Sequence, residues 1–194
     1  MKEEFHPEVD LKQKSRENLV LLLVGSSHHK LSMLHLEKEA FLLWNFHPGM
    51  KDFVRFIKHY RGPFSKEIQE SVTAPMYCLG CWNYSSPTRG DRLSGGYVSI
   101  SPEGEKEYRR LVRKMGEDPD LRQLLSAIRM VRQMYDELSV EELLLLVYDA
   151  YPEYIDRSDV YKDIAKKRRP ISLGLYERGL IDKRRLESLL SKGD

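Results

Sequence analysis

The fold expected of this chain depends on one stretch, Tyr60-Arg61-Gly62-Pro63-Phe64-Ser65, and on the residues that follow it. Its Gly-Pro pair predicts a turn, and Ser65 is a suitable N-cap for a short helix that ends near residue 73. Ile68 and Val72 lie one helical turn apart, so one face of this helix is expected to pack on the core. The opposite face is then left for contact with a partner.

Two longer helices are predicted upstream of this short one. The first covers Ser15 to about Val24, with Ser15 as its N-cap and Gly25 at its end, and the second runs from Ser32 to Trp44. Residues 1–14 are polar and are expected to be loosely held. Phe53–Ile57 is apolar and short, and its periodicity fits either a strand or the end of a helical turn.

A β-hairpin is predicted downstream of the short helix. Met76–Tyr84 reads as one strand, and Tyr97–Ile100 alternates like the returning strand. Ser85–Gly96 contains three glycines and a proline and is therefore expected to be a loop. Ser101 and Pro102 then form an N-cap and first-turn pair that opens another helix.

Further helices are predicted in the last part of the chain. Asp120–Tyr135 carries one apolar stripe, and Ser139 begins a capping box for a helix that stops before Pro152. Ser158–Arg168 and Asp182–Leu190 are expected to be short helices.

The order helix, helix, turn, short helix, strand, glycine-rich loop, strand and helix is typical of a winged helix-turn-helix. We therefore expect a mostly α fold with a small β-hairpin, in which the third helix lies on the core and the hairpin stands beside it as a wing. Residues 15–156 would form the winged-helix domain with its closing helices. Residues 157–194 would form a basic helical C-terminal extension.

Four motifs resemble a known group of proteins. The Gly-Pro turn of residues 60–65 and the helix start Tyr97-Val98-Ser99-Ile100-Ser101-Pro102-Glu103-Gly104 are similar to those of small prokaryotic winged-helix proteins. Residues 138–143 and 147–154 look like the closing helices of the same group, which includes the Panacea antitoxin-like domains. The resemblance covers about residues 15–156. It implies regulation or antitoxin-type binding and does not identify a ligand.

Charge is distributed unevenly along the 194 residues. The net charge is +2, yet residues 157–194 hold 11 Lys and Arg against 6 Asp and Glu, and the remainder holds 21 against 24. A basic tail on a slightly acidic body indicates contact with nucleic acid or with an acidic partner. The N-terminus has no signal-peptide h-region and the apolar runs are too short to span a bilayer, so a cytoplasmic protein without membrane contact is expected.

No motif of the sequence indicates an enzyme, a metal or a cofactor. Cys78 and Cys81 have the spacing of metal or redox pairs, but a structural zinc site needs four ligands, and His28, His29 or His35 would complete one only by chance of folding. The sequence contains no Walker loop, no His-Glu-x-x-His motif and no Ser-His-Asp order.

The predicted third helix offers one set of candidate DNA contacts. Lys66, Gln69 and Thr73 lie on its exposed face and are side chains that reach bases or phosphates. Glu67 and Glu70 share that face and would repel the phosphate backbone. The same helix could instead contact a protein.

Two further sets of basic residues are candidate phosphate contacts. Arg89 and Arg92 lie in the predicted wing, and Lys166-Lys167-Arg168-Arg169 is the densest basic run of the chain. Either set could equally be a solvated surface.

We therefore expect a DNA-binding or antitoxin-type regulatory winged-helix protein that acts as a homodimer and contacts DNA mainly by electrostatic attraction. The alternative is a protein-interaction module on a winged-helix scaffold that does not bind DNA. The acidic third helix favours this alternative, whereas the wing arginines and the basic tail favour DNA.

Overall fold

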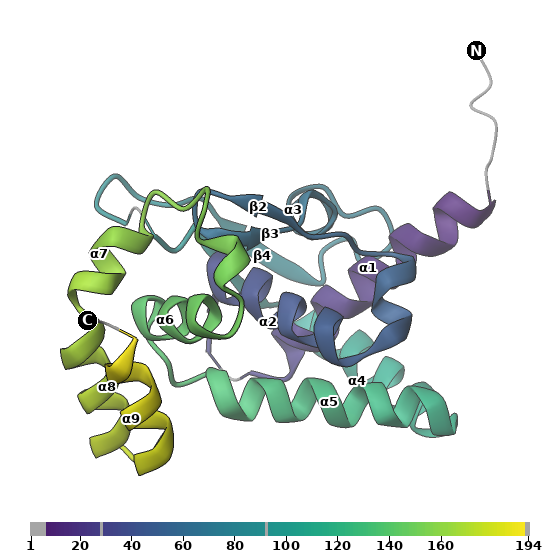
Figure 1. The fold of residues 1–194 in the computed structure, drawn as a ribbon. Helices are drawn as coiled ribbons and strands as arrows, with labels where there is room; N and C mark the ends of the chain where they lie inside the picture. Colours follow the sequence, from purple (N-terminus) through teal and green to yellow (C-terminus); the bar gives the residue numbers. More distant parts are fainter. Residues whose placement is uncertain (1–6, 28, 92, 193–194) are drawn as a thin grey trace.

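The computed structural model describes residues 7–27, 29–91 and 93–192. It is mostly helical with a small antiparallel sheet, which confirms the predicted secondary-structure class (Figure 1). Within the described residues, no helix has both the length and the apolar composition that crossing a membrane requires.

The first half of the chain combines three helices with a three-stranded sheet. The elements are α1 (Pro7–Gly25), β1 (Leu31–Ser32), α2 (Met33–Phe46), α3 (Lys66–Thr73), β4 (Trp82–Ser85) and β5 (Tyr97–Ile100). The strand order is β1-β5-β4, and both pairings are antiparallel. Leu31 pairs with Val98, and Trp82 pairs with Ile100, so the last strand lies between the other two.

A second hairpin separates α2 from α3. After the 3-10 turn η1 (Pro48–Asp52), β2 (Ile57–His59) pairs with β3 (Gly62–Phe64). The predicted turn at Gly62-Pro63 is therefore wrong, because these residues lie in β3 and the chain reverses at Tyr60-Arg61. Gly62 has a φ of +82°, which favours glycine directly after a tight reversal.

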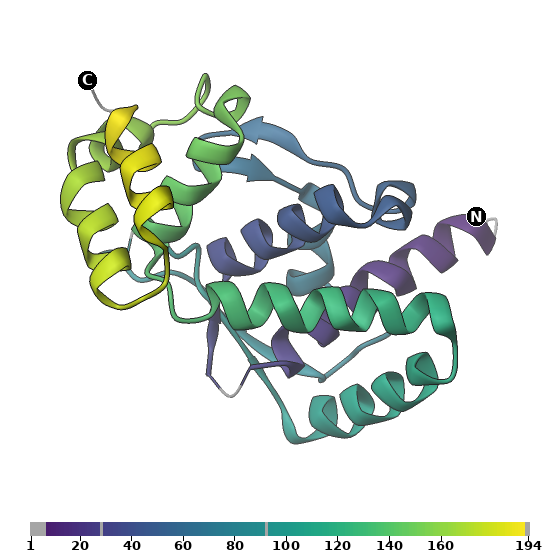
Figure 2. The same cartoon turned by 60° about the horizontal axis from the view of Figure 1, so that its bottom comes forward.

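The second half of the chain is helical. It comprises α4 (Pro102–Gly116), α5 (Pro119–Tyr135), α6 (Val140–Ala150), the 3-10 turn η2 (Pro152–Tyr154), α7 (Tyr161–Lys166), α8 (Arg168–Glu177) and α9 (Lys183–Ser191). In Figure 2, α4 and α5 run side by side along one edge, while α8 and α9 form a pair at the other end of the molecule.

One core joins α1, α3 and the sheet. Leu19–Val24 of α1 are buried all around the helix, and Ile68, Val72 and Val98 are buried in the same cluster. Ile100 is half-buried and packs against this cluster. The expectation that Ile68 and Val72 pack on the core is confirmed, and Val98 of β5 shares that core with Ile100 at its margin.

Three predicted helix starts are confirmed by their hydrogen bonds. The Ser65 hydroxyl accepts from the Ile68 N–H, the Ser101 hydroxyl accepts from the Gly104 N–H, and Ser139 and Glu142 form the predicted capping box. Gly104 lies so close to the Cys81 carbonyl that a Cβ there would meet its oxygen at 1.8 Å. The glycine of the Ser-Pro-Glu-Gly motif is thus required by packing.

The first helix begins earlier than predicted. It starts at Pro7 and not at Ser15, whose hydroxyl instead donates to the Leu11 carbonyl. The expectation of a loose segment is therefore wrong for residues 7–14, while residues 1–6 lie outside the described part. The early turns are held because the Gln13 amide donates to Ser71 of α3 and the Arg16 guanidinium donates to the Phe53 carbonyl.

The predicted strand Met76–Tyr84 is wrong over most of its length, because β4 begins only at Trp82. The cause is the buried Glu17 carboxylate, which accepts the backbone N–H groups of Met76, Tyr77 and Cys78, each at 2.7 Å. Those donors are therefore not free for a strand ladder. The Cys81 N–H then bonds the Cys78 carbonyl and closes a turn.

The C-terminal extension packs on α6 through apolar and ionic contacts. Ile164 and Leu175 belong to clusters shared with α6, and Arg168 is buried against Asp149. The helix predicted over Ser158–Arg168 starts later, at Tyr161. A further helix, α8, was not predicted, and it contains Pro170 in its first turn, where proline is tolerated.

Replacing Glu17 with Ala is expected to lower the free energy of unfolding by about 2–4 kcal/mol, because three backbone N–H groups lose a charged acceptor. Urea unfolding followed by circular dichroism measures this change. Glu70→Ala, on the exposed face of α3, is the matched control and should change stability by less than about 0.5 kcal/mol. Equal stability of the two variants would contradict the assigned role of Glu17.

Arg168→Ala is expected to lower stability by roughly 2–4 kcal/mol, because it removes one cation of a buried ionic cluster. Arg185 and Lys192 also contact Asp149, at 3.0 and 3.1 Å, and limit the loss. The adjacent, exposed Arg169→Ala is the control and should be nearly neutral in the same urea titration. A neutral Arg168→Ala would show that the cluster does not anchor the extension.

Candidate functional site

The outer face of α3 is polar, as predicted. Ile68, Ser71 and Val72 face the core, which leaves Lys66, Gln69, Glu70 and Thr73 exposed. The Trp82 indole N–H donates to the Val72 carbonyl at 3.0 Å, so the end of the helix is fixed to β4. The structure therefore presents the predicted α3 residues to solvent on a rigid support.

The charges of this face largely cancel. The Lys66 ammonium lies 3.2 Å from the Glu70 carboxylate, one turn along the helix. The Glu67 carboxylate accepts from the Ser65 hydroxyl and adds negative charge to the same turn. A face with one paired lysine and two glutamates offers little attraction for phosphate.

The loop between β4 and β5 carries the second candidate set. Arg89 is exposed, and Arg92 lies outside the described residues. The base of the loop is ordered, because Asp91 accepts from the Ser94 N–H and from the Tyr97 hydroxyl. Hydrogen bonding by the Ser94 side chain, then by the Ser94 N–H and the Tyr97 hydroxyl, lowers the pKa of the Asp91 carboxyl. Arg89 is thus exposed on a loop whose base is held next to the sheet.

The basic run of residues 166–169 does not form one surface patch. Lys166 pairs with Asp163 at 3.0 Å, and Lys167 pairs with Glu141 at 2.7 Å. Arg168 is buried, where it bonds Asp149 and the Leu189 carbonyl. The prediction that Arg168 contacts DNA is therefore wrong, because its buried side chain anchors α9. Arg169 is exposed.

The basic run also lies apart from the α3 candidates. Figure 1 places α7 and α8 at the left-hand end of the molecule, whereas α3 lies nearer its middle. The structure therefore does not bring residues 166–169 together with Lys66, Gln69 and Thr73.

Cys78 and Cys81 are both buried and unoxidised. Burial raises the pKa of the Cys78 thiol to about 12, which makes it a poor nucleophile. His35, one of the considered zinc ligands, bonds Ser32 and the Leu138 carbonyl, and His28 lies outside the described residues. In the described ranges, no cluster of three or more His, Cys, Asp or Glu residues could hold a metal ion.

The loop after α3 exposes apolar side chains that the sequence analysis missed. Met76 is 65% exposed, Leu79 is 70% exposed, and Tyr77 lies between them at 37%. We name these three residues the apolar loop patch. The strand prediction for this segment hid it, because a strand would have buried every second side chain.

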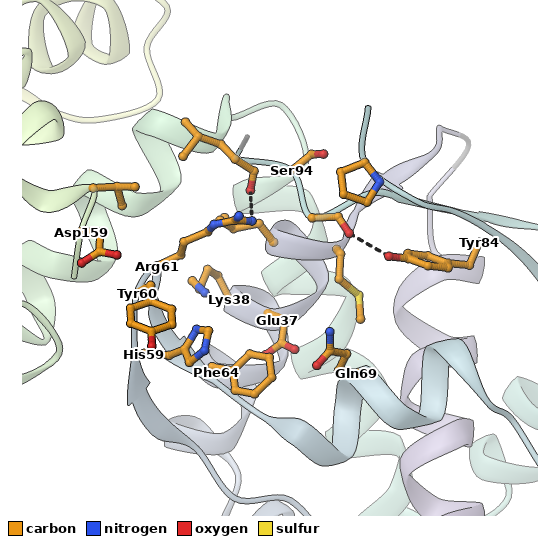
Figure 3. Close-up of a pocket in the computed structure, with 16 residues that line it drawn as sticks. Glu37, Lys38, His59, Tyr60, Arg61, Phe64, Gln69, Tyr84, Ser94 and Asp159 are labelled. Atoms are coloured by element: carbon orange, nitrogen blue, oxygen red, sulfur yellow. Dashed lines mark hydrogen bonds between the residues drawn. The ribbon is translucent and has the colours of Figure 1, made fainter. Parts of the chain in front are cut away.

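A cavity of about 670 Å³ lies beside α3 and was also missed (Figure 3). Its walls come from α2, the β2–β3 hairpin, α3 and the loop after β4, and two charged residues of α2, Glu37 and Lys38, line it while almost fully buried. The available signal was the run Glu37-Lys38-Glu39 within an otherwise apolar helix. At three consecutive helical positions, at least one charge must turn toward the core.

No protein-family model matches the chain, and no curated protein matches it.

Proposed function

We propose that the first half of the chain is a winged helix-turn-helix, with residues 86–96 as its wing. The order α1-β1-α2-α3-β4-β5 and the strand order β1-β5-β4 support this assignment. In such folds the third helix and the wing form one binding face. The β2–β3 hairpin is a departure, because helix-turn-helix motifs usually join these helices by a turn of about 3–4 residues.

We propose that this scaffold is a protein-interaction module of a regulatory or antitoxin type. The observation that carries the proposal is the apolar loop patch of Met76, Tyr77 and Leu79, exposed directly after α3. Glu17 fixes the backbone of Met76 and Tyr77. Because the backbone of the patch is already held, this chain loses little conformational entropy when a partner covers the patch. The near-neutral face of α3 extends this surface with polar groups.

The patch can be tested by replacing Met76 and Leu79 together with Ser. We expect the wild-type chain to retain a specific protein from the lysate of its source cells, and we expect the purified partner to bind the variant at least about tenfold more weakly. Isothermal titration calorimetry with the purified partner gives both affinities. Leu121→Ser on α5, which is 38% exposed, is the matched control and should bind like wild type.

Equal binding of the partner by wild type and by the Met76→Ser/Leu79→Ser variant would move the interface elsewhere. Sedimentation of the wild-type chain alone, run in parallel, tests whether the partner is a second copy of the same chain.

DNA binding is the second candidate function, and the exposed Arg89 in the loop between β4 and β5 favours it. Arg89→Ala combined with Arg92→Ala is expected to flatten the slope of log affinity against log salt by about 2, since each phosphate contact contributes about −0.9. Fluorescence anisotropy with a labelled duplex measures the slope.

Arg169→Ala, at the far end of the molecule, should leave this slope unchanged. A wild-type chain that does not bind DNA even at low salt would exclude the second candidate. Tight binding of a single sequence at high salt would contradict the assignment of a mainly electrostatic contact.

A further inference from the structure

The cavity beside α3 has a floor of buried charges. Glu37 and Lys38 are 4% and 2% exposed, and both line the cavity. One oxygen of Glu37, Oε2, accepts the Ser65 N–H at 2.8 Å, whereas no described residue hydrogen-bonds its Oε1. The Lys38 ammonium donates to the Pro63 carbonyl at 2.8 Å and has two further donors. Buried charges of this kind need partners.

The rim adds a second pair of charges and an apolar wall. Arg61 donates to the Leu93 carbonyl, and Asp159 lies at the mouth. Figure 3 shows Lys38 between Arg61 and Glu37, and the Arg61 charge is close enough to lower the pKa of Lys38. The aromatic wall belongs to the β2–β3 hairpin, where the His59 ring stacks on Phe64 with centroids 4.5 Å apart.

These groups select a ligand that carries both signs of charge. Lys38 and Arg61 are balanced by Glu37 and Asp159, so the cavity has no net formal charge when His59 is neutral. Burial and the nearby Lys38 and Arg61 charges lower the pKa of His59, which keeps it neutral. A polyanion such as a nucleotide would face two carboxylates, whereas a zwitterion can satisfy both pairs. The volume falls within the range of about 300–1,000 Å³ that is usual for small-molecule sites.

We propose that this cavity binds a free α-amino acid with an aromatic side chain. The ligand's carboxylate would be held by Lys38 and Arg61, its ammonium would donate to Oε1 of Glu37, and its ring would lie along the hairpin. This binding site does not depend on the proposed function, because the charged groups that form it are not part of the apolar loop patch, and only Gln69 is shared with the exposed face of α3.

The ionisation of the floor gives the site a distinctive pH dependence. Burial raises the pKa of Glu37 to about 7, with Glu67 adding to the rise and Lys38 and the Ser65 N–H opposing it. Burial lowers the pKa of Lys38 to about 8, and Glu37 opposes that shift. The ligand's ammonium binds the ionised form of the Glu37 carboxylate, and the ligand's carboxylate binds the protonated form of the Lys38 amine. Affinity should therefore fall below pH 7 and above pH 8.

Three probes separate the two halves of the ligand. L-Tryptophan has both charges, tryptamine lacks the carboxylate, and indole-3-propionate lacks the ammonium. We expect calorimetry at pH 7.5 to give an affinity for L-tryptophan at least about tenfold above that for either analogue, because each analogue leaves one buried charge unpaired. The same order should appear in the thermal shift of the full chain.

Two variants test the assigned contacts. Glu37→Gln should abolish the preference for L-tryptophan over indole-3-propionate and should remove the loss of affinity below pH 7. Arg61→Gln, at the half-buried rim, should weaken L-tryptophan and indole-3-propionate by a similar factor and leave tryptamine unchanged. Glu105→Gln, exposed on α4, is the matched control and should behave as wild type.

If Glu37→Gln does not fold, Arg61→Gln and the three probes still test the proposal. The proposal is overturned if L-tryptophan gives neither heat nor a thermal shift at millimolar concentration. It is also overturned if all three probes bind equally, since this would indicate apolar binding without recognition of the charges.

Discussion

The Glu17 carboxylate is the contact on which the candidate binding surfaces depend. It is fully buried in α1, yet it accepts three backbone N–H groups from the loop after α3. A carboxylate with that many donors is well solvated by the protein, so its burial is tolerable. The consequence is long-range, because Glu17 holds the loop that follows α3 and delays the start of β4. It also turns Met76 outward, and a loop without this acceptor would be free to bury its apolar side chains.

A second set of buried charges makes α2 more than a core helix. Arg132 of α5 donates to both oxygens of Glu39 at 2.7 Å, which satisfies that carboxylate fully. Glu37 and Lys38, on neighbouring positions, are satisfied only in part. The contrast matters because all three residues share the same helix and a similar burial. The fully paired Glu39 carboxylate serves packing, although Nε of its partner Arg132 lacks a hydrogen bond, whereas a partly paired carboxylate beside a cavity is the arrangement expected of a binding site.

Local sequence signals predicted where several helices begin, but they did not predict contacts between residues that are distant in the sequence. Ser65, Ser101 and Ser139 were correctly identified as caps, because a cap depends on residues only three positions away. The strand over Met76–Tyr84 was wrong because its competitor, Glu17, lies about sixty positions earlier. The β1–β5 pairing was missed for a related reason, since a two-residue strand has no periodicity to detect. The cavity was missed because one of its walls is the β2–β3 hairpin. Short apolar runs such as the one in this region do not show whether the segment forms a strand or a helix.

The C-terminal extension shows why a count of charges does not predict a binding patch. Its basic residues outnumber its acidic ones, yet Arg168, Arg185 and Lys192 all converge on one carboxylate, Asp149 of α6. Lys167 and Arg178 likewise reach glutamates of α6. The excess positive charge therefore matches acidic groups in the preceding part of the chain, which is itself slightly negative. The uneven distribution along the sequence becomes a complementary contact in the folded chain, and electrostatic attraction within the molecule leaves less of it for a phosphate backbone.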